Sequence, residues 1–309
     1  MPRYNTPSRF QSGINAYDPR DLLADSVSVS MPTAYTYRFR GNGAEAPSFV
    51  NTIATTGTAV MGNAVLGGGW LLTTAATLSD TVQSQLAGAA FQFVPGFPCW
   101  YQARVEVDDI SLAEFVHGVQ ETNTSALAAT DGIWFHKASG GTTVDLVTAI
   151  GGVLTTHSAV IDLGTLFAGG TYTANLTGGA VTSITVNQQP TGIYAGMSAL
   201  VTLTGGAGSG ATAIAYVGNG NTLTFQVLAG GSGYTSSPAV ALIPQVPMGF
   251  FYDGNATLYY GFGGRKWGSV ASPALTPSLL SPVVELKAST AAARVLNYAD
   301  LVAGGRLPY

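Results

Sequence analysis

Short runs in which apolar and polar residues alternate recur along the chain. Residues 103–107 read Ala-Arg-Val-Glu-Val, and residues 159–163 and 184–186 alternate in the same way. Successive side chains of a β-strand point to opposite faces of a sheet, so this period of two predicts half-buried strands. The 35 threonines also favour a sheet, and frequent Gly and Pro leave little room for long helices. The sequence therefore predicts an all-β chain of many short strands.

Two segments fit a helix as well as a strand. Residues 112–119 are one of them. The other, residues 290–303, has apolar residues at about helical spacing and is followed by Gly304, where a helix C-cap would lie. Periodicity alone leaves both open. The uncharged run 58–78 is broken by glycines, and we interpret it as strand and turn rather than as a membrane span.

Composition divides the chain into four parts. Residues 1–62 hold five of the twelve cations and few apolar clusters before residue 47, which is typical of an extended arm that orders on a partner or of a mobile terminus. Residues 175–247 contain a degenerate repeat of about forty residues, each copy reading strand, Gly-Tyr turn, strand. We expect a β-sandwich formed by 63–174 and 248–309, with 175–247 inserted as a small β-module.

Charge is scarce and unevenly distributed. Only 9% of residues are charged, against about 25% in typical domains. Residues 163–252 contain no Asp, Glu, Lys, Arg or His at all. A sequence pI near 5.2 argues against a basic nucleic-acid surface. Cys99 is the single cysteine and the N-terminus lacks a signal-peptide core, so we expect a soluble protein folded in a reducing cytoplasm, without nucleic-acid or membrane partners.

Candidate catalytic and metal-binding groups are sparse. His117, His136 and His157 fit no metal-ligand spacing, and we expect neither a metal nor a cofactor. Ser209 lies in a Gly-rich stretch that does not match a nucleophile elbow, so a link between strands is the favoured role. Cys99 lies in an apolar stretch without a nearby base, which indicates a buried, inert thiol.

One carboxylate cluster and the tryptophans allow two interpretations each. Glu106 and Asp108 would share a strand face, with Asp109 beside them, and paired carboxylates perform glycoside hydrolysis. We favour a solvated face, because Val105 and Val107 supply the buried side. For the tryptophans, sandwich-core packing is favoured over a sugar-binding platform. These residues are Trp70, Trp100, Trp134 and Trp267.

Outside the insertion, the chain resembles the lectin-like (concanavalin-type) jelly-roll proteins found among tailed-bacteriophage virion proteins, including capsid decoration (cement) proteins. The resemblance implies a strand for 290–296 and a hairpin at 249–254, and it places 171–173 beside 248–251 in one region of the sandwich. The runs that carry it are Trp-Tyr-Gln-Ala-Arg-Val-Glu-Val (100–107), Thr-Asp-Gly-Ile-Trp-Phe (130–135), Gly-Phe-Phe-Tyr-Asp-Gly (249–254) and Thr-Ala-Ala-Ala-Arg-Val-Leu (290–296).

Three functions follow as hypotheses. The first is a non-enzymatic capsid decoration protein of a virion, assembled in the bacterial cytoplasm, which binds the major capsid protein and itself as a homotrimer. The second is a carbohydrate-binding tail or fibre module that attaches to a host-surface glycan, and the third is a glycan-cleaving enzyme, which we favour least. For the first, the candidate contacts with shell carboxylates are the cations of the arm. These are Arg3, Arg9, Arg20, Arg38 and Arg40.

Overall fold

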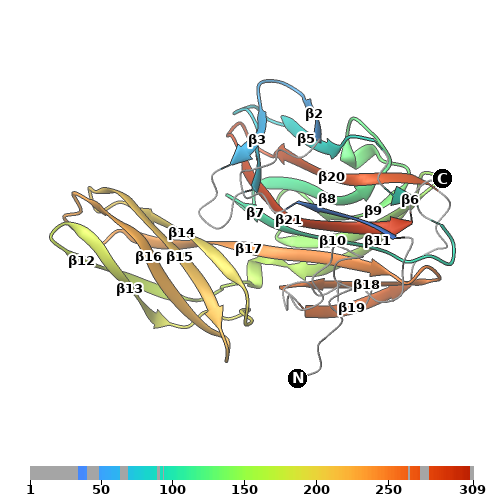
Figure 1. Cartoon of the computed structure of the whole chain (residues 1–309). Coiled ribbons are helices and arrows are strands. Elements are labelled where there is room, and N and C mark those ends of the chain that lie inside the picture. The colour runs from blue at the N-terminus through green and yellow to red at the C-terminus, as the bar shows by residue number, and fades with distance from the viewer. Residues whose placement is uncertain are drawn as a thin grey trace. The chain divides into compact units, whose positions relative to one another are not determined.

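The computed structural model describes residues 34–39, 49–62, 69–88, 91–92, 94–263, 265–271 and 278–306. These residues form β-strands and two short 3-10 helices, η1 (Ala126–Ala128) and η2 (Leu163–Thr165), and no α-helix occurs among them. No helix in this described part is long and apolar enough to cross a membrane. The chain divides into two compact units, unit 1 (Met1–Ile161 with Pro247–Tyr309) and unit 2 (Asp162–Val246) (Figure 1).

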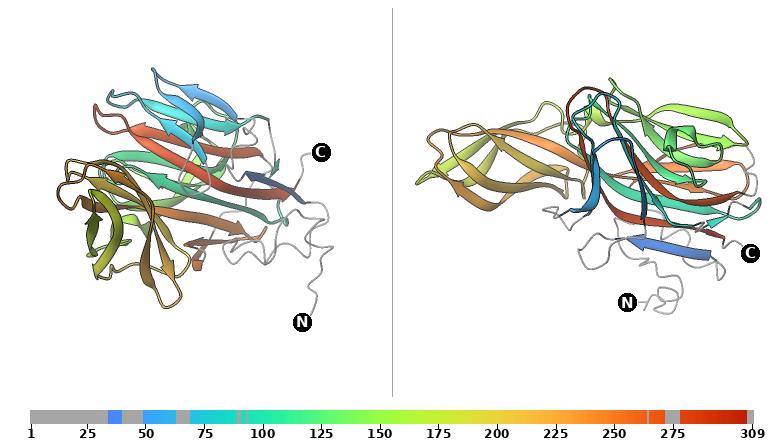
Figure 2. Two further views of the ribbon diagram at one scale, coloured as in Figure 1. Left: turned by 60° about the vertical axis from the view of Figure 1, so that its left-hand side comes forward. Right: turned by 90° about the horizontal axis from the view of Figure 1, so that it is seen from above.

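Unit 1 is a sandwich of two antiparallel sheets, which Figure 2 shows from two further directions. In sheet A, β21 lies between β7 on one side and β4 and β1 on the other, and the second half of β17 joins β7 to the β18–β19 hairpin. Its strands are β1 (Ala34–Phe39), β3 (Thr58–Gly62), β4 (Gly69–Thr73), β7 (Cys99–Val107), β17 (Ala239–Tyr252), β18 (Thr257–Phe262), β19 (Arg265–Ala271) and β21 (Val295–Arg306).

Sheet B has the order β2–β5–β20–β8–β9–β10. Strand β20 also pairs through its first residues with β6 (Phe91–Gln92), so it takes part in both sheets. The strands of sheet B are β2 (Phe49–Ile53), β5 (Thr81–Leu86), β8 (Ala113–Gln120), β9 (Gly132–Lys137), β10 (Thr143–Ile150) and β20 (Leu279–Ala288); β11 (Val153–Asp162) follows β10. The predicted all-β, jelly-roll sandwich is confirmed.

Aromatic side chains fill the space between the two sheets. Tyr101 of sheet A stacks on Phe250 of the neighbouring strand, with ring centroids 5.5 Å apart. On the sheet B side, the rings of His117 and Phe135 stack at 5.2 Å. The alternation seen in the sequence of β7 places Tyr101, Ala103, Val105 and Val107 in this interior. Burial of these large rings is the main source of stability for the sandwich.

A buried hydrogen-bonded chain crosses the interior. The Tyr101 hydroxyl lies 2.9 Å from Nδ1 of His117 and 3.0 Å from the Tyr298 hydroxyl, so a single hydroxyl connects sheet A to sheet B. Burial lowers the pKa of His117 to about 3 and raises the pKa of Tyr101 well above its usual value. Both groups are therefore neutral at physiological pH.

Unit 2 consists of a hairpin and a four-stranded sheet. The hairpin is β12 (Thr171–Thr177) and β13 (Ala180–Gln188). In the sheet, the first half of β17 pairs with β14 (Ser198–Thr204), followed by β15 (Ser209–Gly218) and β16 (Thr222–Ser232). The inner face of this sheet packs against the hairpin, where the Tyr172 and Phe225 rings meet edge to face at 5.1 Å.

The sequence repeat corresponds to equivalent strands of unit 2. Residues 184–186 and 225–227 lie in β13 and β16, which contact each other. Residues 201–203 and 240–242 lie in β14 and β17, which pair with Val201 opposite Leu242. The two copies thus contact each other through both of their strands, and unit 2 needs no third copy to bury its apolar side chains.

The structure differs from several sequence expectations. The segment 112–119, which also fitted a helix, lies in strand β8 from residue 113 onward, because the sandwich buries both faces of this strand. Unit 2 begins at Asp162 rather than at residue 175, and residues 171–173 belong to it, because β12 pairs with β13. Within the proposed arm 1–62, residues 34–39, 49–53 and 58–62 are strands of the sandwich. These segments are too polar to form a core of their own, and pairing with the strands of the sandwich supplies the contacts that they lack.

Replacing His117 with Asn should flatten the acid dependence of folding stability. The folded protein keeps His117 neutral down to about pH 3, whereas the unfolded chain binds a proton below about pH 6.5. The wild type therefore loses up to about 1.4 kcal/mol per pH unit from this group as the pH falls through that window. Urea unfolding at several pH values should show H117N less stable than wild type at pH 7 and a gap that narrows towards pH 4. A constant gap would contradict the buried neutral histidine.

Candidate functional site

Of the five arginines proposed as shell contacts, one lies within the described residues. Arg3, Arg9, Arg20 and Arg40 lie outside the described residues. Arg38 lies in β1, where its backbone is opposite Val302 of β21. The backbone of β1 thus extends sheet A along the second half of β21.

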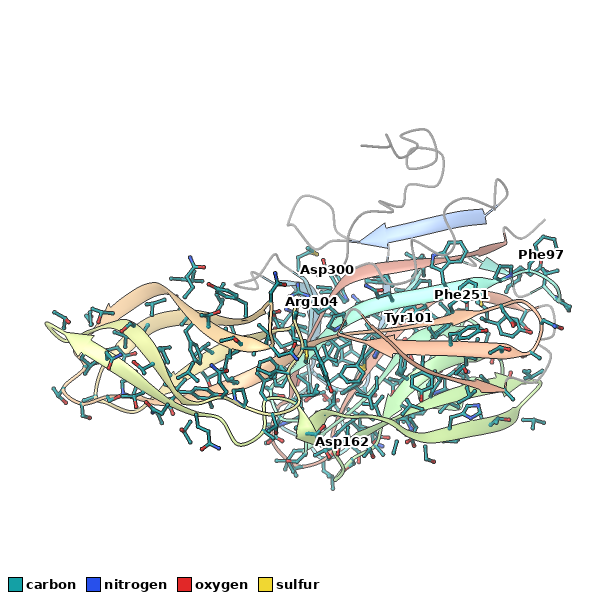
Figure 3. All side chains as sticks on the ribbon, turned by 90° about the horizontal axis from the view of Figure 1, so that it is seen from below. Phe97, Tyr101, Arg104, Asp162, Phe251 and Asp300 are labelled. Atoms are coloured by element: carbon teal, nitrogen blue, oxygen red, sulfur yellow. The ribbon has the colours of Figure 1, made fainter. Side chains whose placement is uncertain are left out.

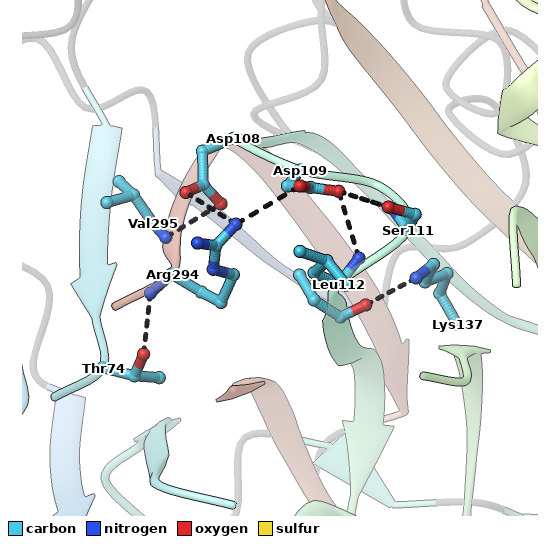
Figure 4. A network of polar contacts seen from close by, with 9 residues as sticks. Thr74, Asp108, Asp109, Ser111, Leu112, Lys137, Arg294 and Val295 are labelled. Atoms are coloured by element: carbon cyan, nitrogen blue, oxygen red, sulfur yellow. Dashed lines mark hydrogen bonds and ion pairs between the residues drawn. The ribbon is translucent and has the colours of Figure 1, made fainter. Parts of the chain in front are cut away.

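The carboxylates after β7 hold a loop together (Figure 4). Asp109 Oδ1 accepts hydrogen bonds from the Ser111 backbone and hydroxyl and from the Leu112 backbone, and these bonds lower the pKa of Asp109 against the opposing effect of its partial burial. Arg294 lies 3.6 Å from Asp108 and 3.5 Å from Asp109. Both carboxylates therefore have structural partners in the β7–β8 loop and the start of β21.

The other candidate groups of the sequence also have structural positions. Glu106 lies within β7, opposite Asn297 of β21, and Asp108 directly follows the strand, where it is paired with Arg294. Burial raises the pKa of the Cys99 thiol, which is unreactive in this state. Trp70, Trp100 and Trp134 are buried in the core, and the side chain of Trp267 lies outside the described part.

Sheet A carries a paired charge on the face that points away from the interior. Arg104 Nε lies 2.9 Å from Oδ2 of Asp300 (Figure 3). Because Tyr101 and Ala103 point inward, Arg104 projects to the opposite side of β7. Phe251 and Tyr259 lie on neighbouring strands of the same sheet, with ring centroids 6.2 Å apart. The charges of Arg104 and Asp300 thus neutralise each other within unit 1.

Sheet B carries an ionic cluster on its outer face. Glu114 lies 3.1 Å from His136 Nε2 and 2.8 Å from Lys287 Nζ. The hydrogen bond from His136, followed by that from Lys287, lowers the pKa of Glu114 to about 2 although partial burial opposes the shift. No set of three His, Cys, Asp or Glu side chains in the described residues could hold a metal ion.

A loop between β8 and β9, residues 121–131, covers the rest of that face. Ala126 and Ala129 of the loop pack on Val116, Trp134 and Val283 of the sheet. Polar side chains beneath it bind its backbone at several points, and burial raises the pKa of one of them, Glu285. These contacts are Gln83 Nε2 to Asn123 O, Gln85 Nε2 to Glu121 O, Gln120 Nε2 to Ala126 O, and Ala126 N–H to Glu285 Oε2.

Unit 2 presents a different kind of surface. After Asp162 it contains no acidic, basic or histidine residue, and its exposed side chains are mostly Thr, Ser, Asn, Gln and Tyr. On the β12–β13 hairpin, Asn175 Nδ2 donates to Ser183 and Thr185, and Asn187 Nδ2 donates to Thr173. The polar side chains of the hairpin therefore satisfy one another's hydrogen-bonding groups.

The four-stranded sheet of unit 2 has an outer face that points away from the hairpin. Ala213, Ala215 and Val217 of β15 are buried, so the alternating residues Ile214 and Tyr216 point outward. Tyr216 is 45% exposed and lies opposite Thr224 on β16, while Ile214 lies opposite Gln226. We call Tyr216, Thr224, Gln226, Ile214 and Leu200 the outer face of unit 2.

The sequence interpretation did not single out this face. Its signal is present, because small or branched apolar residues at 213, 215 and 217 alternate with Ile214 and Tyr216. Alternation alone does not say which set of side chains is covered, and in the sequence the four tryptophans are the candidates for an aromatic platform. The packing of Phe225, the β16 partner of Ala215, against Tyr172 of the hairpin decides the question.

Comparison with known proteins gives likenesses of fold. No protein-family model matches the chain, and no curated protein sequence matches it. Among solved structures, the Emp47p carbohydrate recognition domain has a TM-score of 0.44 at 6% identity, covering 89% of this chain and 96% of that one. Peanut lectin has a TM-score of 0.39 at 8% identity, with 89% and 99% covered. A protein of unknown function from Shewanella oneidensis MR-1 has a TM-score of 0.41 at 7% identity, with 89% and 86% covered.

These neighbours are lectin-like jelly rolls and a protein without a known function, and none of the three is named as a virion protein. The all-β assignment of this chain rests on the strand pairing described above.

Replacing Glu114 with Gln should destabilise unit 1 in a pH-dependent manner. The lowered pKa means that the carboxylate stabilises the fold above about pH 4.5 and loses this effect as the pH falls towards 2. We expect E114Q to lower the free energy of unfolding by about 1.5–3 kcal/mol at pH 7, the range for hydrogen bonds to charged groups. Urea unfolding at pH 7 and pH 3 measures this, with Lys287→Met completing a double-mutant cycle. Equal losses at both pH values would contradict the ionic cluster.

Proposed function

We propose that this protein is a non-enzymatic, carbohydrate-binding attachment module. The observation that supports this most directly is the surface of unit 2, which exposes hydroxyl and amide side chains without any acidic, basic or histidine residue after Asp162. Such a surface offers hydrogen-bond donors and acceptors for hydroxyl-rich ligands and no electrostatic attraction for ionic ones.

The arrangement of charges in unit 1 supports a binding role over a catalytic one. The carboxylates considered as acid–base groups, Asp108 and Asp109, are paired with Arg294 and with loop backbone. Glu114 is paired with His136 and Lys287, and Glu285 holds the 121–131 loop. General acid–base catalysis requires a group that can reach a substrate, and these groups are engaged in holding loops and strands.

Two of the solved structures compared above are a carbohydrate recognition domain and a lectin. The proposal of a carbohydrate ligand for this chain is based on the chain's own surface residues. An uncharged surface favours ligands that carry many hydroxyl groups and little net charge, so we expect neutral glycans to be preferred over sulfated or sialylated ones.

Binding of the full chain to an array of immobilised glycans tests this function. We expect retention on neutral glycans without release of shortened products, and a dissociation constant that changes less than about twofold between 50 mM and 500 mM NaCl, because screening acts on ionic contacts. An array without any bound glycan, or with steadily released products, would contradict the proposal. Heat-denatured protein is the control for adsorption.

Attachment to a virus shell is a second candidate, favoured by one specific observation. Strand β1 adds to β21 through its backbone, so the 33 residues that precede it, with Arg3, Arg9 and Arg20, start from the border of sheet A. A cationic segment that starts there could cross to acidic groups of a neighbouring subunit, and a site between subunits related by threefold symmetry would favour a homotrimer.

Removal of residues 1–33 tests that second candidate while keeping β1. If the segment clamps the chain to a shell, the truncated protein should saturate phage capsids stripped of this protein at least tenfold less tightly than the full chain. A variant with Arg3, Arg9 and Arg20 changed to Gln should show a smaller loss that vanishes at high salt. Equal saturation by the full and truncated chains would exclude the clamp.

A further inference from the structure

The outer face of unit 2 combines an exposed aromatic ring with neutral polar groups. Tyr216 is 45% exposed, although it lies in a strand that is paired on both sides rather than in a loop. Its neighbours across the sheet are Thr224 on β16 and Ser198 on β14. The strand pairing fixes the backbone under the ring, so the ring is presented in a defined direction.

An apolar strip continues from the ring. Leu200 lies opposite Ile214, which in turn lies opposite Gln226, and both aliphatic side chains are half-buried. Tyr216 and Gln226 are diagonal neighbours on adjacent strands, a separation that long side chains can span. The result is a sheet face on which one ring and two aliphatic side chains are bordered by a hydroxyl and an amide.

The polar groups of this face are available, unlike those of the hairpin. The Gln226 side chain is exposed, and within the described part of the chain its amide has no hydrogen-bond partner. Thr224 Oγ1 donates only a long bond, 3.3 Å, to the Tyr216 carbonyl. On the hairpin, by contrast, Asn175 and Asn187 already donate to neighbouring hydroxyls at 2.8–3.0 Å.

We propose that the outer face of unit 2 is the carbohydrate-binding site and that its ligand is an extended neutral polysaccharide, one sugar ring of which lies on Tyr216. This inference rests on the proposed function and names its site and ligand class. The apolar C–H face of a pyranose covers the aromatic ring and the strip, and its hydroxyls bond to Gln226 and Thr224.

The absence of charged side chains in unit 2 after Asp162 determines which class of ligand suits the outer face. An anionic glycan, a nucleic acid or an acidic lipid would need cations, and residues 163–252 contain none. The side chains of this face are spread over three paired strands, an arrangement that suits a linear polymer contacting several of them along the sheet, whereas small molecules bind in concave sites. Tyrosine also supplies a large amphipathic contact area with little conformational entropy to lose.

Affinity electrophoresis of the full chain in gels containing dextran, mannan, galactan or dextran sulfate tests this site. We expect retardation by at least one neutral polymer and none by dextran sulfate. Tyr216→Ala should weaken that retardation at least tenfold, Tyr216→Phe should retain it, and Gln226→Leu should weaken it several-fold. Leu154→Ala, which removes a side chain that is 56% exposed on β11 of unit 1, is the matched control and should bind as wild type.

The outcomes separate the site from the function. If wild type binds a neutral polymer and Tyr216→Ala binds equally well, the site is wrong and the proposed function stands. If wild type binds no polymer and no array glycan, both are overturned. Preference for dextran sulfate would overturn the neutral ligand class, and a change of oligomeric state in Tyr216→Ala without glycan binding would assign the face to a second copy of the chain. Circular dichroism of each variant checks that it is folded.

Discussion

The contact between Tyr101 and His117 is the constraint on which unit 1 depends. The two residues belong to different sheets, and their hydrogen bond of 2.9 Å lies inside a bed of stacked rings. Burying a polar group costs free energy unless it is hydrogen-bonded, so this bond favours one alignment of the two sheets. Because burial of an unpaired charge is costly, the ionic pairs of unit 1, such as Arg104–Asp300 and Glu114–Lys287, lie on the outer faces of its sheets.

Unit 2 is built without ionic pairs. Its turns use glycines, several with positive φ, such as Gly192, where a Cβ would collide with the Thr165 carbonyl. Amide side chains replace ionic contacts at the strand ends: Gln189 both donates to and accepts from the backbone of Leu223. Backbone pairing and small apolar side chains are enough to hold such a sheet, which leaves its exposed surface free to be neutral.

Much of the fold could be predicted from the sequence, because alternation and turn residues are local signals. The strands around residues 103–107 and 184–186 follow from them. The strand at residues 113–120 could not be predicted, because a strand that is buried on both faces loses its alternation. The start of unit 2 could not be predicted either, because it depends on the pairing of β12 with β13. Partners far apart in sequence, such as Asp108 and Arg294, or the layer that covers one face of β15, are set by topology and leave no local signal.

The central claim is that a neutral glycan covers the outer face of unit 2. Hydroxyl-radical footprinting of the full chain, with and without the neutral polysaccharide that retards it, measures this at single side chains. The account predicts that oxidation of Tyr216 falls several-fold on binding, while oxidation of Val153 and Leu154 in unit 1 stays unchanged. Protection confined to unit 1, with Tyr216 oxidised as rapidly as in the free protein, would contradict it.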